Sequence, residues 1–513
     1  MVDNKLHNRT AGTSLFPILF ITFIMMHLLL VGNVRIYPFV DVPNHLALAN
    51  IYRYYGQPTN QFAQFYALNT LIKPNTFHMY FCGSKIFPSV EFGNKIFFCL
   101  YIILLPVTTL FAIKKLGGNP WFAFLSFLYL YNYNVSYGFV GFAMAIPFVL
   151  LFFSVLLDHL EEDNLLTMTI LTGLFMLLFF MHALAVLFAL LIFISCCLYQ
   201  NRYSLLKVFK KSVVVIPVAV LIVLWWQQDS EQFGGPGIIG FLFDYYKNEY
   251  LQKIALRGGL FAFDNYALFE GLWGYFVAMI FSLFVVVLVL RYIYADLKSN
   301  SCLLRNNKVN LLLIFISCSL CCFLLIPLRL PGYSFLIQRF PVFVFLTIII
   351  LGSVVSPKHL SRAGISTMCA VCLLHFVCWF GYFRDFDKEN ELFSRDLFLT
   401  AENGETMAGL IYDCKFRGRP IYNQFLDYYI VWKQGIATTR VIDERSFPVS
   451  RKVSKNKLPP FIDRVGEYHP YDGRYADMDY ILVREYIPRP EQESLKKFDL
   501  LRSAGKWSMY KKR

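Results

Sequence analysis

The length of its apolar segments is the strongest constraint on how this chain can fold. A helix needs about twenty mostly apolar residues to cross the hydrocarbon core of a bilayer. By that measure we predict about eleven membrane-spanning helices. Their centres lie near Phe23, Leu104, Phe127, Val149, Phe175, Leu190, Val220, Phe281, Ser319, Thr347 and Leu373. So many long apolar segments cannot share one aqueous core, so we predict an all-α, multi-pass integral membrane protein.

The composition agrees with a lipid environment. Of the 513 residues, 57% are hydrophobic and 16% are charged, whereas soluble chains carry roughly a quarter charged residues. The run from Leu15 to Val31 is too long for a secretory signal and lacks a small-residue cleavage site, so we predict that it is the first membrane helix. The stretch from Leu165 to Tyr199 is too long for one helix, and we divide it at Met181 and His182.

Basic residues orient the predicted helices. In the eleven-helix arrangement the basic loops all fall on one side, whereas the short loops opposite hold only Arg329, near the ninth helix. Because cytoplasmic loops are enriched in Lys and Arg, we predict a cytoplasmic N-terminus and an extracytoplasmic C-terminus. The formal charge of +14 is thereby explained without nucleic acid, which we do not expect as a partner. The basic loops contain Lys5 and Arg9; Lys114 and Lys115; Arg202, Lys207, Lys210 and Lys211; Arg291, Lys298, Arg305 and Lys308; and Lys358 and Arg362.

Three segments are predicted to lie outside the membrane on the C-terminal side. They are a long first outer loop (about 32–95), a second outer loop (about 227–268) and the tail. We therefore expect a membrane domain over residues 1–383 and an extracytoplasmic C-terminal domain over 384–513. In that domain a helical stretch from about Glu389 to Ile411 precedes alternating segments at 479–483 and 507–510, which predict strands and a small α+β domain.

Cysteine and acidic residues give little support for a metal. Most of the 12 cysteines lie in apolar runs, where a thiol behaves as a small hydrophobe. Cys82 and Cys414 are expected outside the membrane, where they could pair in an oxidising compartment or remain free. Asp385 and Asp387 have Asp-x-Asp spacing, but we expect them in a solvated loop after the last helix. We therefore predict neither a divalent metal nor another cofactor.

The first outer loop carries the clearest candidate for chemistry. Pro43 suits the first position of a helix, which places Asp41 at or just before the helix N-terminus. A carboxylate there, beside His45, could act as a general base toward an acceptor hydroxyl. A purely structural alternative is that Asp41 only caps the helix.

Two distant residues are predicted to lie at the same interface. His182 occupies the turn between the fifth and sixth helices, where it could contact substrate or simply form the turn. Arg339 lies within the tenth apolar segment, about ten residues from Arg329, and an arginine in mid-membrane costs about 3 kcal/mol or more. A lipid-linked phosphate would be a natural partner for its guanidinium. Alternatively, the side chain reaches up to lipid headgroups.

Several short motifs are spread over most of the chain: Asp41-Val42-Pro43-Asn44-His45-Leu46-Ala47, Lys73-Pro74-Asn75, Asn132-Tyr133-Asn134, Gly138-Phe139-Val140-Gly141-Phe142, Met181-His182-Ala183-Leu184, Gln338-Arg339-Phe340-Pro341, Asp479-Tyr480-Ile481-Leu482-Val483 and Gly505-Lys506-Trp507-Ser508-Met509-Tyr510. Together these motifs resemble the GT-C superfamily of polytopic glycosyltransferases, and a bacterial membrane group within it. The chain departs from the pattern of that group at Gln338, where an acidic residue often precedes the arginine.

The resemblance implies transfer of a sugar from a polyprenyl-phosphate donor on the non-cytoplasmic face, with inversion. Asp41 would be the catalytic base, and His45, His182, Arg339 and Arg35 would bind substrate. The acceptor would be a glycan, a lipid or a protein, and the location the bacterial inner membrane.

The alternative function is a lipid or solute transporter. Ion-coupled transporters usually carry acidic residues near mid-membrane, but none lies deep in these apolar segments, since Glu270 is at an edge.

Overall fold

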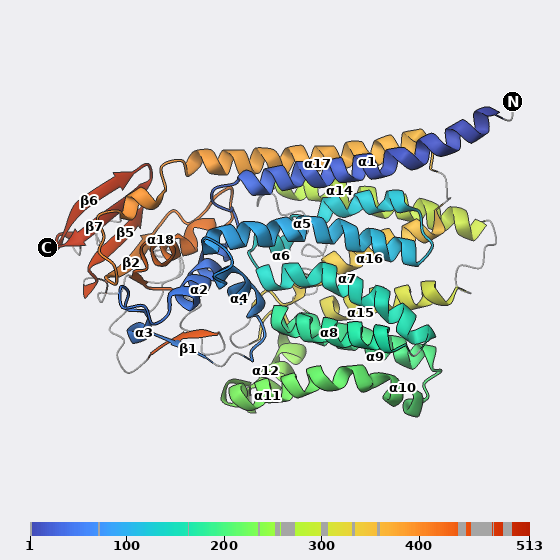
Figure 1. Ribbon diagram of the computed structural model, residues 1–513, viewed down its shortest axis with the longest axis horizontal. Helices are drawn as coiled ribbons and strands as arrows, with labels where there is room; N and C mark the ends of the chain where they lie inside the picture. Colours follow the sequence, from blue (N-terminus) through green and yellow to red (C-terminus); the bar gives the residue numbers. More distant parts are fainter. Residues whose placement is uncertain are drawn as a thin grey trace.

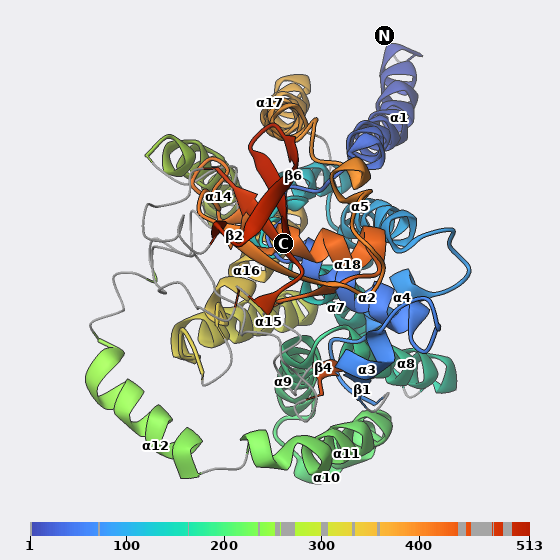
Figure 2. The ribbon, with the colours of Figure 1, turned by 90° about the vertical axis from the view of Figure 1, so that its left-hand side faces the viewer.

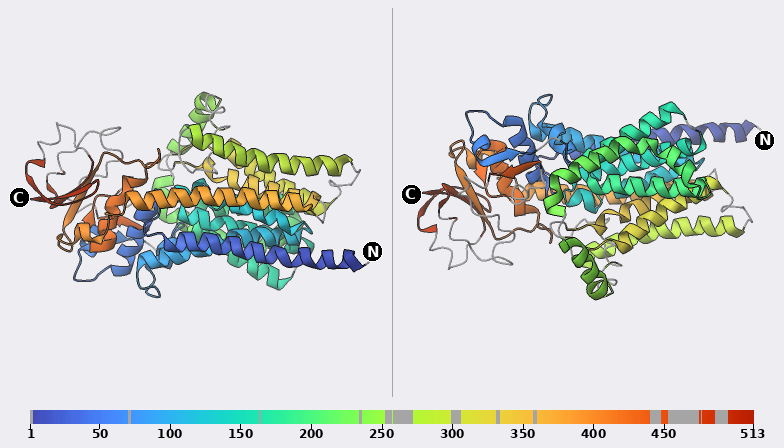
Figure 3. Two further views of the ribbon diagram at one scale, coloured as in Figure 1. Left: turned by 90° about the horizontal axis from the view of Figure 1, so that it is seen from above. Right: turned by 90° about the horizontal axis from the view of Figure 1, so that it is seen from below.

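A computed structural model describes most of the chain, namely residues 3–69, 72–162, 164–233, 236–251, 257, 272–298, 306–330, 334–356, 360–439, 448–452, 475, 477–485 and 495–513. Parts of the predicted second outer loop (about 227–268), namely residues 234–235, 252–256 and 258–268, lie outside these residues. The molecule is elongated: long helices run side by side, the N-terminus lies at one end of the bundle, and a sheet near the C-terminus lies at the other (Figures 1 and 3).

Within the described residues, nine helices are long and apolar enough to cross a membrane. The bundle helices are α1 (Asp3–Asn33), α5 (Val90–Lys115), α7 (Val140–Glu161), α8 (Leu165–Met181), α9 (Ala183–Gln200), α11 (Ile216–Phe233), α14 (Leu272–Lys298), α15 (Asn307–Leu325), α16 (Pro341–Val355) and α17 (Arg362–Glu389). Of these, α8 is apolar but, at 17 residues, just short of the length taken for a membrane span. The predicted break at His182 is confirmed, because α8 ends at Met181 and α9 begins at Ala183.

The bundle has an interior and a lipid-facing surface. Large apolar side chains such as Ile18, Leu29 and Val287 remain exposed on the outside of the helices, as expected where lipid replaces water. Inside the bundle, Phe153 and Phe343 both lie against Phe315, with ring centroids 5.0 and 6.1 Å from it. Tight aromatic packing therefore holds the helices together.

The segment around Phe127, predicted as the third membrane helix, is not an α-helix. It forms η1 (Pro120–Tyr129), a 3₁₀ helix, followed by the short α6 (Tyr133–Ser136). An ion pair between Lys115 and Asp158 joins the ends of α5 and α7, so the two helices run in the same direction and η1 returns the chain between them. Such backbone is tolerated at membrane depth only where protein covers it. The side chains from Trp121 to Tyr129 are all buried, and η1 packs against α5, α16 and α17.

The first outer loop folds into α2 (Val42–Tyr54), α3 (Phe62–Phe65), β1 (Tyr66–Leu68) and α4 (Phe77–Gly83). Further along the chain, short segments flank α11: α10 (Leu205–Lys211) and η2 (Ser212–Val215) precede it, and α12 (Pro236–Asp244) and η3 (Tyr245–Glu249) follow it.

The tail contains a five-stranded sheet in the order β3-β2-β5-β7-β6. Both predicted strands are confirmed as β5 (Tyr480–Arg484) and β7 (Trp507–Lys512), which pair antiparallel. The predicted helix from Glu389 to Ile411 is wrong, because α17 ends at Glu389 and 406–411 form β2, parallel to β5. The other elements are η7 (Arg395–Phe398), β2 (Thr406–Ile411), η8 (Ile421–Asp427), α18 (Tyr428–Lys433), β3 (Ile436–Ala437), β4 (Val449–Arg451) and β6 (Phe498–Ala504).

Two expectations for the end of the membrane domain also change. Asp385 and Asp387 lie within the last turns of α17, not in a loop, because that helix continues past the apolar segment. Asp385 pairs with Arg417 of the tail. Cys82 and Cys414 are both buried, and no disulfide joins them in the described structure.

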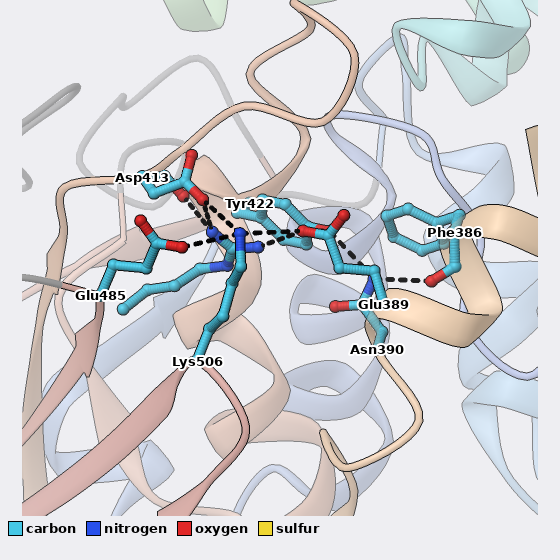
Figure 4. Close-up of polar contacts among 8 residues, drawn as sticks. Phe386, Glu389, Asn390, Asp413, Tyr422, Glu485 and Lys506 are labelled. Carbon is cyan, nitrogen blue, oxygen red and sulfur yellow. Dashed lines mark hydrogen bonds and ion pairs between the residues drawn. The ribbon is translucent and has the colours of Figure 1, made fainter.

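The tail is fastened to the end of α17 by a group of charged residues (Figure 4). The Arg484 side chain is 1% exposed, pairs with Glu389 at 2.6 Å and lies 3.6 Å from the centroid of the Tyr422 ring. It also pairs with Asp413, and Lys506 bonds to the same carboxylate at 3.2 Å. A buried arginine with this many partners holds the sheet in one orientation on the helix.

The first loop and the tail together form a cap over one end of the bundle (Figure 2). We use "cap" for residues 34–89 and 390–513. Strands β1 and β4 pair antiparallel across it. The Asn50 side chain donates to the carbonyl of Ile430 at 2.8 Å, and the Trp432 indole donates to Glu91 at the start of α5 at 2.8 Å. Residues almost 400 positions apart are thereby fixed beside one another.

Candidate functional site

Asp41 lies at the junction of the cap and the bundle. Its backbone N–H donates to the carbonyl of Tyr137, between α6 and α7, at 3.1 Å. Gly138 makes this contact possible, because it has a φ of +83° and a Cβ there would lie 2.6 Å from the Asp41 nitrogen. Asp41 is the residue preceding α2, yet in the described structure its side chain makes no capping hydrogen bond. The capping role left open by the sequence is therefore not what holds this carboxylate.

Arg339 lies near Asp41 in η6 (Ile337–Arg339), just before α16. The side chain is 8% exposed, and its guanidinium carbon is 4.0 Å from the centroid of the Phe139 ring and 5.3 Å from that of Phe142. Asp41 is close enough to interact with it electrostatically. Among the described residues, Nε and Nη1 of Arg339 have no hydrogen-bond acceptor. A buried cation with unpaired donors is suited to binding an anion.

His182 and His45 complete this group. His182 lies edge-on to Phe142, 5.1 Å between ring centroids, and its Nδ1 accepts from the Leu184 N–H at the start of α9. His45 is on α2, with its ring 5.5 Å from that of His78. Burial, the neighbouring His78 and the Arg339 cation lower the pKa of His45 to about 3. His45 is therefore neutral at physiological pH and can act as a hydrogen-bonding group but not as a cation.

The structure thus brings together four of the five predicted site residues. Arg35 lies elsewhere: its guanidinium donates to the carbonyl of Asn390 at the end of α17, and it lies near Asp387. Its described partners connect the first loop to α17 instead of to Arg339.

The tail contributes residues that were not predicted from the sequence. Gln424 of η8 donates from Nε2 to Oδ1 of Asp41 at 2.7 Å. Asp427, at the end of η8, accepts from the Asn44 amide of α2 at 2.8 Å and from the Thr439 hydroxyl at 3.2 Å. The pKa of Asp427 rises to about 7, mainly because of burial, although both hydrogen bonds oppose the shift, and nearby Asp41 adds to it.

A third tail residue, Arg419, approaches from the same side. It is 3% exposed and donates to the Ser136 hydroxyl at 2.9 Å, and its guanidinium carbon is 5.7 Å from the ring centroids of both Tyr133 and Tyr137. For Gln424 and Asp427 the only sequence signal was that they are polar residues within the apolar run Ile421 to Trp432, and Arg419 lies outside that run. No spacing rule connects any of the three to Asp41.

More buried polar atoms lie near Arg339 without partners. Both side-chain polar atoms of Asn134 on α6, and Oε1 of Gln338 beside Arg339, have no described hydrogen-bond partner. The elements that carry them, α6 and η6, pack against each other. Buried polar groups are normally satisfied by protein, water or ligand, so this region has the unmet hydrogen-bonding capacity of a polar binding site.

The same residues are poorly suited to bind a metal ion. Among the described residues, no group of three or more His, Cys, Asp or Glu side chains could hold a metal ion. The group around Asp41 also contains Arg339, and a metal cation beside this arginine would be repelled.

The chain is a multi-pass membrane protein, and its fold is similar to that of a solved GT-C glycosyltransferase. A solved structure to which the chain is similar is ArnT from Cupriavidus metallidurans, a GT-C enzyme, bound to undecaprenyl phosphate. The TM-score is 0.51 at 10% sequence identity, over 97% of this chain and 98% of that chain. The resemblance drawn from the motifs is therefore confirmed for the fold. No family model matches the sequence, and no curated protein matches it.

Proposed function

We propose that this protein is a glycosyltransferase that moves a sugar from a polyprenyl-phosphate donor to an acceptor on the non-cytoplasmic face of the membrane. The observation that carries the proposal is that Asp41 lies within electrostatic range of a buried Arg339 whose Nε and Nη1 have no described acceptor. One residue offers a base and the other an anion site, which are the two groups that such a transfer needs. The similar ArnT structure holds undecaprenyl phosphate, which supports a donor of this chemical class.

The donor phosphate would bind at Arg339. The guanidinium has two N–H groups directed to no described acceptor, and the Phe139 and Phe142 rings exclude water around it. Charge-assisted bonds to phosphate are strong in such surroundings. The polyprenyl tail would then extend between bundle helices, and Asn134 and Gln338 would offer hydrogen bonds to the headgroup. Arg35, held at Asn390, is not assigned to the phosphate.

The reaction would proceed by direct displacement. Asp41 accepts the proton of an acceptor hydroxyl while the hydroxyl oxygen attacks the anomeric carbon. The bond from that carbon to the phosphate oxygen breaks, and its electron pair leaves with polyprenyl phosphate. Arg339 stabilises the charge that develops on the phosphate. Attack from the face opposite the phosphate inverts the anomeric carbon. Because the phosphate is already a good leaving group, we assign no metal or other cofactor to this step.

The acceptor would approach from the cap. Neutral His45 and His182 would hydrogen-bond substrate hydroxyls near Asp41. A glycan, a lipid or a protein could supply the hydroxyl, and the site would face the periplasm if the protein is in a bacterial inner membrane. A transporter would require no base at Asp41, so catalytic turnover separates the two functions.

A donor panel tests the proposal. Membranes containing the protein, and matched membranes without it, are supplied with radiolabelled sugars on polyprenyl phosphate and, separately, with labelled nucleotide sugars. We expect protein-dependent transfer of label from at least one polyprenyl-phosphate sugar. Transfer from nucleotide sugars only, or movement of an intact lipid without glycosidic bond formation, would contradict the assignment.

A further inference from the structure

Gln424 is placed unusually close to the proposed base. It lies in η8 of the tail, 383 residues from Asp41, and its Nε2 is 2.7 Å from Asp41 Oδ1. Its backbone departs from helical geometry (φ −110°, ψ 17°), which interrupts η8 at this residue. The side chain is 4% exposed. This contact is therefore built into the interior of the cap.

The orientation of the Gln424 amide follows from its partner. An ionised carboxylate can only accept hydrogen bonds, so the amide must direct its NH₂ toward Asp41. The amide oxygen then points elsewhere, and among the described residues Oε1 of Gln424 is buried without a donor. Leaving a buried acceptor unsatisfied costs about 1–3 kcal/mol, which a bound hydroxyl would relieve.

On the basis of the function proposed above, we infer that Gln424 positions the Asp41 carboxylate and receives, at Oε1, a hydrogen bond from a hydroxyl of the acceptor. One acceptor hydroxyl would give its proton to Asp41 while a neighbouring hydroxyl donates to Gln424. This arrangement fits an acceptor with adjacent hydroxyls, such as a sugar, better than one with a single hydroxyl. The tail would thereby select the acceptor in addition to covering the site.

Other charged or titratable groups near Asp41 also influence its titration. Arg339 of η6 and Asp427 of η8 both interact with its charge. His45 lies one turn along α2 and is neutral near physiological pH. Changing Gln424 alters a direct contact and leaves these three groups in place, so a shift in the titration of Asp41 reports on Gln424.

The first experiment needs neither donor nor acceptor. Purified full-length protein is treated with a carbodiimide, which reacts with protonated carboxyl groups, over a range of pH, and labelling of Asp41 is read by peptide mass spectrometry. Gln424→Glu places a second carboxylate beside the first, so the labelling midpoint should rise by about one pH unit or more. Gln424→Met removes one donor at similar size and should give a smaller rise. An unchanged midpoint in Gln424→Glu overturns the positioning role.

The matched control is Gln434, also in the tail, whose Oε1 accepts from Asn60 of the first loop at 3.0 Å. Gln434→Met disturbs contact between the tail and the loop away from Asp41, so it should leave the midpoint unchanged. A shift there equal to that of Gln424→Met would show that loosening the cap is sufficient and would also overturn the inference. Thermal unfolding of each variant confirms that it is folded.

The second experiment tests the acceptor contact. Transfer is measured against serial dilutions of a lipid and glycan extract of host membranes as the acceptor source. Gln424→Met should raise the apparent KM for the extract about five- to tenfold, as expected for one neutral hydrogen bond. A KM of Gln424→Met equal to that of wild type overturns the acceptor contact. Absence of transfer by wild-type protein counts against the proposed function, and the labelling result then decides the positioning role alone.

Discussion

At the scale of single residues, the buried charges show which groups are structural. Arg257 is 1% exposed, and its guanidinium donates to the carbonyl of Ile326 at 2.9 Å and to the Tyr245 hydroxyl at 2.8 Å. Arg484 is held by two carboxylates. In all three arginines Nε has no described acceptor, but in Arg339 Nη1 also has none. Since burying unpaired donors has a cost, this difference supports the proposal that Arg339 binds a ligand.

Replacing Arg339 should therefore reduce catalysis with little loss of stability. We expect Arg339→Met to lower kcat/KM for the lipid-linked donor by about 10²- to 10³-fold, the range found when a charge-stabilising donor is removed. The kcat/KM of Arg339→Lys should lie between those of Arg339→Met and wild type, because lysine keeps the positive charge but not the planar set of N–H donors. Arg257→Met is the matched control: it should lower the unfolding temperature and leave kcat/KM of the folded protein unchanged. Wild-type kcat/KM in Arg339→Met would contradict the phosphate site.

Asp427 makes the stability of the cap depend on pH. The pKa of this carboxyl is raised in the folded state, so its contribution to stability is fully present below its ordinary value of 3.8 and is lost as pH rises through about 7. Asp427→Asn removes this titration while keeping a polar group beside Asn44 and Thr439. Between pH 5 and 8, the unfolding temperature of wild type should fall relative to that of Asp427→Asn. If the unfolding temperatures of the two proteins change in parallel over this pH range, the raised pKa of Asp427 is contradicted.

At the scale of elements, the turn between α6 and α7 supports the backbone of Asp41. Gly138→Ala should push that backbone away, because the added methyl group meets the Asp41 nitrogen and φ is +83°. A displacement of about 1 Å can cost about 10²-fold in rate, so we expect transfer to fall by that order. Gly117→Ala is the control, since Gly117 has a φ of +73° with nothing within 4 Å of the added group. Equal transfer rates in the two variants would show that backbone strain alone is responsible.

Among the secondary-structure elements, the sequence correctly predicted the helices marked by apolar length and the strands marked by alternation. Ten of the eleven apolar segments form α-helices, and both predicted strands are present as β5 and β7. The exception near Phe127 is as apolar as the others, and its 3₁₀ geometry depends on surrounding helices that a local pattern does not contain. The helix expected from 389 to 411 also failed, because β2 is stabilised by pairing with β5 about 70 residues later.

The candidate site also contains residues that could be predicted from the sequence and residues that could not. Asp41, His45, His182 and Arg339 could be predicted because each lies in a short motif beside a predicted helix end, and the alternation of crossings brings those ends together. Gln424 and Asp427 could not, because they reach the site through the packing of η8 against α2. No single-sequence pattern records which tail segment lies over the first loop.

At the scale of the whole molecule, the cap and the N-terminus lie at opposite ends of the bundle (Figure 1). The basic turn at Arg202 belongs to the end that also carries Lys115, because α9 runs away from His182. From the positive-inside rule we expect that end to lie in the cytoplasm. An epitope tag after Arg513 should be accessible to antibody on spheroplasts, and one inserted after Arg202 only after permeabilisation. The reverse pattern would place the cap and Asp41 in the cytoplasm.

The central claim is that Asp41 is the base of a sugar transfer from polyprenyl phosphate. The most direct measurement uses purified protein in proteoliposomes with the labelled donor identified from the panel, and follows both sugar transferred and polyprenyl phosphate released. In wild type the two should appear in equal amounts. Asp41→Asn should lower both by about 10²- to 10⁴-fold, the usual contribution of a general base, while donor binding stays near the wild-type level. Transfer at the wild-type rate by folded Asp41→Asn would contradict the account.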